Sequence, residues 1–209
     1  MKIDSSSSFL WENEISLYMQ FDKTELIHLT ISVLTITAAF HIILVKAGVQ
    51  AGLGAVFLTV GVAFLFHELG HKSVAQRFGC TAVYRAWTAG LILALAFAIF
   101  TPFIFAAPGA VYIHKKYLTV RENGLISLSG PLTNFLLAFA FLGIIFMFPG
   151  LGTIGMLGFQ INMFLGMFNM LPFPPLDGYD ILSWSKITWI VLFGALVYFT
   201  FFFQPGVIF

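Results

Sequence analysis

Long apolar runs without charged residues recur along the chain and predict membrane-spanning helices. A helix that crosses a bilayer needs about 20 mostly apolar residues. The runs are continuous and do not alternate between apolar and polar positions, so they predict helices and not barrel strands. They form six hydrophobic segments, one each in 26–45, 47–66, 86–113 and 187–209 and two in 123–176, where Pro149, Gly150 and Gly152 mark the turn.

The composition agrees with this pattern. Of the 209 residues, 59% are hydrophobic and 9% are charged, and the mean hydropathy is +0.96. Soluble domains carry about 25% charged residues. The low charge excludes soluble, disordered, coiled-coil and nucleic-acid-binding proteins. We expect an all-α integral membrane protein in a lipid bilayer, with no nucleic-acid partner. A polar N-terminal tail at 1–25 precedes a single domain at 26–209.

A motif that carries chemistry follows the second segment: His67-Glu68-Leu69-Gly70-His71. Residues four apart lie on one face of a helix, so both imidazoles can reach one zinc ion. Glu68 is placed to take a proton from a water molecule that zinc activates. An ionisable cluster at membrane depth is costly and indicates function. The alternative is a cluster that only caps the second span at the membrane interface.

A catalytic zinc ion needs a third protein ligand. The acids downstream of the motif are Glu122, Asp177 and Asp180. Glu122 lies in a charged segment typical of a solvated loop, although it is the only Glu available for a membrane zincin of another class. Asp177 follows N-M-L-P-F-P-P-L at 169–176, whose three prolines end the helix and present Asp177 on a rigid, irregular element. For the other histidines we expect polar lining or interfacial roles: His28, His41 and His114.

Three motifs together resemble the site-2 protease family of intramembrane zinc metalloproteases, and they occur in the family's order. They are H-E-L-G-H at 67–71, G-P-L-T-N at 130–134 and N-M-L-P-F-P-P-L-D-G at 169–178. The resemblance is to a minimal form without an appended soluble domain. It implies that His67, His71 and Asp177 ligate one Zn²⁺ per chain.

The resemblance also suggests roles for other residues of these motifs. Glu68 would be the catalytic base. Asn169 would help to hold the substrate or to polarise its carbonyl. Asn134 is a further candidate for substrate binding, and an interhelical contact or a helix start explains it equally well.

The zinc ligands can meet only if the second and fifth segments end on the same face of the membrane. If every segment crossed, those two ends would lie about 30 Å apart. A re-entrant element at 86–113, which enters and leaves on one face, removes the conflict. It also places nine of the ten Lys and Arg residues on the zinc side, with only Lys46 opposite. The positive-inside rule makes that side cytoplasmic.

We therefore expect about five full transmembrane helices in the cell membrane, with the N-terminus and the active-site opening cytoplasmic and the C-terminus outside. Within the re-entrant element, 91–105 fits a half-inserted helix or part of a short β-hairpin. Residues 106–113 are candidates for a strand edge, which would hold an extended substrate by backbone pairing.

The predicted function is an intramembrane zinc endopeptidase that hydrolyses peptide bonds in or near transmembrane segments of membrane proteins. The alternative is a non-proteolytic zinc-binding membrane scaffold or a zinc-handling protein. A transporter spreads ionisable residues over several spans, whereas here they gather around one centre. The sequence carries no signal for an oligomeric state.

Overall fold

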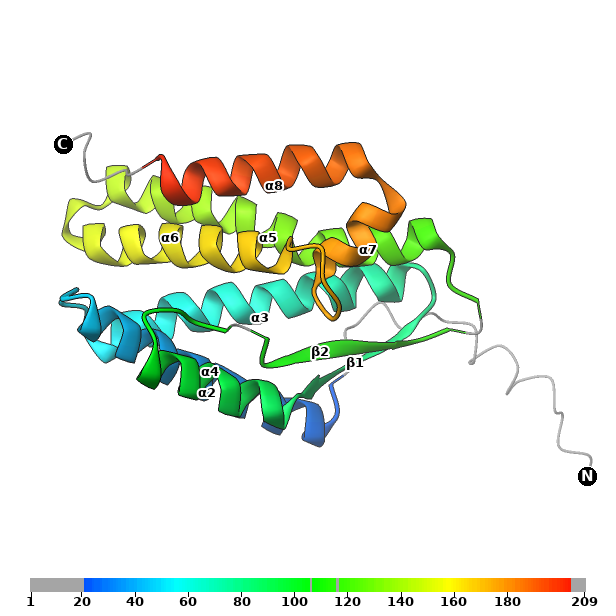
Figure 1. Cartoon of the computed structure of the whole chain (residues 1–209), viewed down its shortest axis with the longest axis horizontal. Coiled ribbons are helices and arrows are strands. Elements are labelled where there is room, and N and C mark those ends of the chain that lie inside the picture. The colour runs from blue at the N-terminus through cyan, green and yellow to red at the C-terminus, as the bar shows by residue number, and fades with distance from the viewer. Residues whose placement is uncertain (1–20, 106, 116, 204–209) are drawn as a thin grey trace, which may run out of the picture.

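The computed structural model of the chain describes residues 21–105, 107–115 and 117–203. Residues 1–20 of the polar tail predicted at 1–25 therefore lie outside the described residues. The elements in chain order are α2 Lys23–Lys46, α3 Leu53–Arg77, β1 Thr81–Ala86, α4 Thr88–Phe100, β2 Gly109–His114, α5 Val120–Met147, the 3₁₀ turn η1 Pro149–Leu151, α6 Gly152–Asn169, α7 Asp177–Trp184 and α8 Lys186–Phe201. Figure 1 shows that the longer helices lie roughly parallel or antiparallel to one another.

Four of the described helices are long and apolar enough to cross a membrane, and they confirm the predicted membrane protein. These are α2, α3, α5 and the combined η1–α6 helix. The last predicted segment contains α8, which is apolar but has 16 residues and a length of about 24 Å. Residues 204–209 of that segment are not described.

The region 86–113 turns back, as it must if the second and fifth segments are to end on the same face of the membrane. Strands β1 and β2 pair antiparallel, from Thr81 opposite His114 to Ala86 opposite Gly109. The chain therefore leaves this region at the end where it entered. Between the strands, α4 occupies 88–100, so most of 91–105 is a helix and the strands flank it.

Lys46 holds the far end of α4 against the end of α2. Its Nζ donates hydrogen bonds of 2.9–3.1 Å to the carbonyl oxygens of Ala98, Ile99 and Thr101. These carbonyls at the C-terminal end of α4 lack helical partners and carry partial negative charge, which a lysine satisfies. The lone basic residue predicted on the opposite face thus has a structural role.

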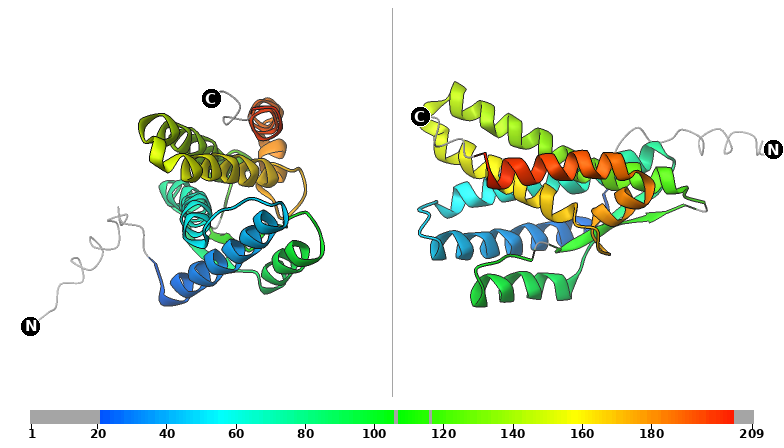
Figure 2. Two further views of the ribbon diagram at one scale, coloured as in Figure 1. Left: turned by 90° about the vertical axis from the view of Figure 1, so that its left-hand side faces the viewer. Right: turned by 45° about the horizontal axis from the view of Figure 1, so that its top comes forward.

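Helices α3 and α6 run in the same direction, and α5 runs antiparallel to both (Figure 1). One buried apolar cluster joins α2, α3 and α6, with Ile36, Val60 and Ile161 among its members. A second joins α5, α6 and α8 and includes Phe159 and Leu196. The left view of Figure 2, which looks along the long axis, shows α8 on the outer side of the α5–α6 pair and α4 beside α2. This packing brings the ends of α3 and α6 to one face of the molecule.

A buried ion pair ties the start of α2 to the motif helix. The Nζ of Lys72 lies 2.7 Å from both carboxylate oxygens of Glu25, and Glu25 is completely buried. The backbone N–H of Tyr84 in β1 also donates to Glu25, at 3.0 Å. Each buried charge depends on its partner, because an uncompensated one is costly. Asp22 caps α2, which begins at Lys23, a few residues before the predicted domain boundary at 26.

Candidate metal centre

His67 and His71 lie one turn apart on α3 and point to the same side. Both side chains are buried, with 4% and 7% of their surface exposed. Their Nε2 atoms are 3.0 Å apart. The helix continues to Arg77, beyond the uncharged run, so the motif lies inside regular helix and not at its end. The predicted spacing of the two imidazoles is therefore realised.

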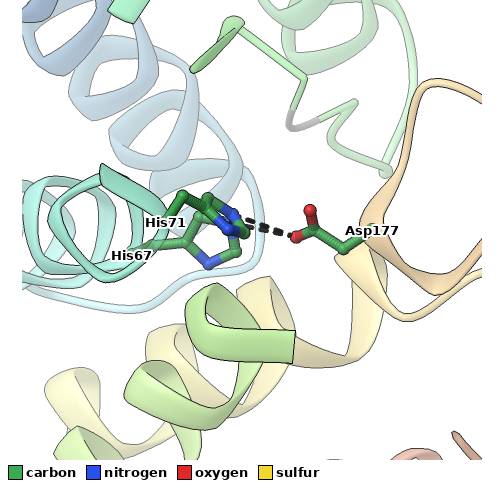
Figure 3. A group of neighbouring side chains, drawn as sticks. All are labelled: His67, His71 and Asp177. Carbon is green, nitrogen blue, oxygen red and sulfur yellow. Dashed lines mark hydrogen bonds and ion pairs between the residues drawn. The ribbon is translucent and has the colours of Figure 1, made fainter. Parts of the chain in front are cut away.

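Asp177 reaches the histidines from the other half of the molecule. Helix α6 ends at Asn169, and the irregular segment that follows is tied to α8, because the indole N–H of Trp189 donates to the carbonyl of Met170 at 2.8 Å. Helix α7 then begins at Asp177 itself. Oδ2 of Asp177 lies 3.3 Å from the Nε2 atom of each histidine, as Figure 3 shows.

The other ring nitrogens have partners that determine where the protons lie. The amide of Asn134 donates to the carbonyl of Ala63 and to Oδ1 of Asn162, at 2.9 and 3.0 Å. Its own Oδ1 therefore faces His67 and accepts a hydrogen bond from Nδ1 at 2.6 Å. The network thus assigns the proton of neutral His67 to Nδ1.

His71 has the same arrangement with a backbone partner. Its Nδ1 lies 2.8 Å from the carbonyl oxygen of Ile126, which can only accept. In the neutral rings, both Nε2 atoms then present lone pairs toward each other and toward the Asp177 carboxylate. Three electron-rich atoms so close together repel unless a cation or proton lies among them. Metal-binding histidines are usually oriented in this way, by a hydrogen bond from the ring N–H that does not face the metal to a neighbouring acceptor.

The donor set fits a zinc ion. Within the described residues, His67, His71 and Asp177 form the single group of three metal-binding side chains whose ligand atoms lie close together. Tetrahedral zinc bonds of about 2.0–2.1 Å separate neighbouring ligand atoms by about 3.4 Å. The observed separations of 3.0 and 3.3 Å are close to this value. Two nitrogens and one carboxylate oxygen also match the ligands of hydrolytic zinc sites.

Gly130 on α5 leaves the space in front of the histidines open. A Cβ atom at this position would clash with Nε2 of His71 and lie 2.7 Å from Cε1 of His67. Real Cβ atoms essentially never come that close to another heavy atom. The glycine of the G-P-L-T-N motif therefore lets α5 approach the ligand nitrogens without filling the centre.

Glu68 lies beside the ligand group and lines a cavity. The cavity has a volume of about 480 Å³, and the three candidate ligands and strand β2 also line it. Glu68 is buried, and its Oε2 has no hydrogen-bond partner among the described residues. A buried carboxylate oxygen without a partner is costly and is kept where chemistry uses it.

The two asparagines from the sequence motifs lie in different places. Asn169 lines the cavity at the end of α6, and its amide donates to the carbonyl of Leu165. Asn134 is fully buried behind His67 and is not among the residues that line the cavity. Its placement corresponds to an interhelical contact. A direct substrate contact of either residue stays a prediction.

Two other potential ligands have partners away from the centre. Glu122 forms the capping box of α5 with Thr119 and pairs with Lys115 at 2.6 Å. The Nδ1 atom of His28 accepts a hydrogen bond from the backbone of Ala86. Neither belongs to the metal-binding group of the described chain. The zincin alternative that uses Glu122 therefore gains no support.

Sequence reasoning missed the residues that orient the ligands. Asn162 holds Asn134, and the carbonyl of Ile126 holds His71. Every residue has a backbone carbonyl, so no sequence signal identifies the carbonyl of Ile126 as the partner of His71. Asn162 carried a usable signal, because it is a polar side chain within an apolar membrane-length helix.

Comparison with known proteins agrees with this centre. Residues 55–160 match the family model "Peptidase family M50". The chain is 45% identical over 193 residues to "Putative zinc metalloprotease MJ0611" of Methanocaldococcus jannaschii, an alignment that covers 87% of this chain and 97% of the relative. It is 29% identical to "Putative zinc metalloprotease YwhC" of Bacillus subtilis, over 71% of this chain and 80% of the relative. No solved structure matches the chain.

Proposed function

The chain belongs to peptidase family M50, the site-2 protease family, and on this premise we propose that it hydrolyses peptide bonds in or near transmembrane segments of membrane proteins. One observation carries the proposal: a His-His-Asp group lines a cavity among helices of membrane length, with the free carboxylate of Glu68 beside it. A substrate segment from the bilayer then reaches the centre laterally.

His67, His71 and Asp177 would hold one Zn²⁺ per chain. When bound, zinc lowers the pKa of water and polarises a carbonyl as a Lewis acid. The Nδ1–H bonds to Asn134 and Ile126 keep both imidazoles in the orientation that such binding needs. Asn134 acts here through His67, as a positioning residue.

Glu68 is the general base and acid of the proposed reaction. It takes a proton from the attacking water and then gives that proton to the leaving amine. Burial of Glu68 excludes competing solvent, and its unpaired Oε2 is available to receive the proton. Asn169, at the cavity wall, is the candidate to hold the substrate carbonyl.

Strand β2 offers a place for the substrate backbone. Peptide bonds in an intact helix are screened by hydrogen bonding, so the substrate must become extended. Within the described sheet, β2 pairs only with β1, on one edge, and residues of β2 line the cavity beside the metal centre. An extended substrate adds to the other edge of β2 by main-chain hydrogen bonds.

Zinc content and cleavage test the proposal together. The purified chain is expected to carry one zinc per molecule by metal analysis and to cleave single-span reporter proteins in liposomes. A chelator should stop cleavage and added zinc should restore it. Asp177→Ala should lose the metal, since it removes a ligand, whereas Glu122→Gln, which retains the capping box, should keep it.

The opposite results point to the alternatives. Zinc bound at one per chain without turnover of any reporter favours a zinc-binding scaffold. Loss of zinc in Glu122→Gln, with retention in Asp177→Ala, favours a site that uses Glu122.

We propose further that the metal-centre end of the molecule faces the cytoplasm. The described Lys and Arg residues at that end are Lys23, Lys72, Arg77, Arg85, Lys115, Arg121 and Lys186, and Lys46 lies at the other end. This imbalance supports a cytoplasmic location by the positive-inside rule.

Labelling in intact cells checks this orientation. In a chain with Cys80 replaced by Ala, a membrane-impermeant thiol reagent added outside should spare Lys115→Cys and modify Val49→Cys. Val49 is exposed in the loop after α2, so it is the matched control. The reverse pattern of labelling would invert the topology.

A further inference from the structure

The cavity has two ends with different chemistry. Its apolar end is lined by Ile36, Phe64 and Leu165, from α2, α3 and α6. Ile36 lies 13 residues beyond the start of α2, or about 20 Å along the helix. The other end is lined by Asn123 and Ser127 from the first turns of α5 and by Asp180 from α7. Figure 1 shows that α5 and α7 start at the end of the molecule where α3 finishes.

Asp180 is the charged member of the polar end, and no assigned role uses it. It lies one helical turn after Asp177 and is half-buried. Ser127 donates a hydrogen bond to its Oδ2 at 3.3 Å, and Asn123 also interacts with it. Both partners are neutral, and Asp180 forms no ion pair with a described residue. Burial and the charge of Asp177 raise the pKa of its carboxyl.

The negative charge of Asp180 has no cationic side chain to balance it in the described cavity wall. The described cavity wall contains three carboxylates, on Glu68, Asp177 and Asp180, and no Lys or Arg. In the proposed function, the divalent cation balances the first two. The third carboxylate is then the source of a local negative potential at the polar end. A cationic group of the substrate would supply the missing partner.

On the premise of the proposed function, we infer that Asp180 selects substrates that carry a Lys or Arg a few residues from the scissile bond, on the side of the polar end. Residues three apart on a helix are about 5–6 Å apart at Cβ, and an extended chain advances about 3.3 Å per residue. With the reach of a lysine side chain, the basic residue falls within about two to four positions of the bond.

The proposed orientation makes such substrates common. The polar end faces the cytoplasm in that orientation, and single-span proteins carry an excess of Lys and Arg just inside the membrane. The apolar end then receives the hydrophobic part of the same segment. A substrate that enters from the bilayer would thus match the cavity at both ends.

A purely structural role for Asp180 would be different. The bond from Ser127 joins α7 to α5, and this contact needs an acceptor but no charge. In Asp180→Asn the amide oxygen still accepts from Ser127, so a structural role survives. A role in selection depends on the charge and is lost.

The test uses one single-span reporter. Lys, Gln or Glu is placed in turn at the second, third and fourth residue from the scissile bond, on the side that faces the polar end. Wild type should favour Lys over Glu in kcat/KM by about tenfold at the responsive position. Asp180→Asn should reduce this ratio to within about twofold, and Asp180→Lys should reverse it. Asp22→Asn removes an acid outside the cavity and should keep the wild-type ratio. High salt should weaken the preference.

Binding provides a readout that does not need turnover. In the Glu68→Gln background, the dissociation constants of the same reporters should follow the same order and respond to Asp180→Asn in the same way. Equal Lys-to-Glu ratios in wild type and Asp180→Asn would overturn the inference. Absence of cleavage by wild type would overturn the proposed function instead, and the binding order would still decide the role of Asp180.

Discussion

Glu68→Gln is expected to lower the rate of peptide-bond cleavage by about 10²–10⁴-fold while the zinc content stays at the wild-type level. Glutamine has nearly the shape of glutamate, so the packing beside the two histidines is kept. It cannot take a proton from water at neutral pH. Glu68 also lies outside the ligand group, so the metal should remain. Single-turnover cleavage of a reporter and metal analysis of the same preparation measure both quantities.

Two controls make this result specific. Asp177→Ala should lose cleavage and zinc together, since it removes a proposed ligand. Thermal unfolding in detergent should show that Glu68→Gln is folded. Undiminished cleavage by Glu68→Gln would eliminate Glu68 as the base, and loss of zinc in this variant would make it a ligand.

Gly130→Ala is expected to weaken zinc binding by about 10–100-fold, the loss typical when the surroundings of a metal ligand are disturbed. The new Cβ atom would occupy the space directly in front of His71 and His67. Since α5 also packs closely against α3 and α6, the helix cannot withdraw cheaply. Cleavage should fall with the metal and recover partly at high zinc concentration. Zinc retention against graded chelator measures the affinity.

Gly143→Ala is the matched control. Gly143 lies on the same helix, and a Cβ atom there meets no other atom within 4 Å. Its zinc affinity and cleavage should stay within about twofold of wild type, and its stability should rise slightly, because alanine favours helix over glycine by about 1 kcal/mol. Similar losses of zinc affinity and cleavage in both variants would mean that the two glycines affect helix α5 as a whole and that Gly130 has no specific role at the metal centre.

Part of the metal centre was predictable from the sequence pattern. The i, i+4 spacing of His67 and His71 needs only helix geometry, so their shared face was predictable. The resemblance to the site-2 protease family implied the pairing with Asp177. That pairing required an odd number of crossing segments between the second and the fifth, because only then do their C-terminal ends lie on one face of the membrane. The structure has this arrangement, with the chain turning back at β1 and β2.

Other features depend on contacts between distant residues. The amide chain from Asn162 through Asn134 to His67 joins three helices, and neither asparagine lies near His67 in sequence. Glu25 belonged by composition to the polar tail, yet it is buried against Lys72. Burial of these groups comes from how the helices pack, and hydropathy along the chain does not encode it.

The sequence by itself determined the membrane class, the helical spans, the metal-binding residue types and the need for a re-entrant segment. The first two follow from local periodicity, the scarcity of charge and the thickness of a bilayer, and the other two rest also on the motifs and their resemblance to the site-2 protease family. The tertiary structure alone decided that 88–100 is a helix between two strands, that Gly130 clears the space before the histidines, and that Asp180 lies at the polar end of the cavity. These depend on which side chains meet across helices, and close packing settles that only in three dimensions.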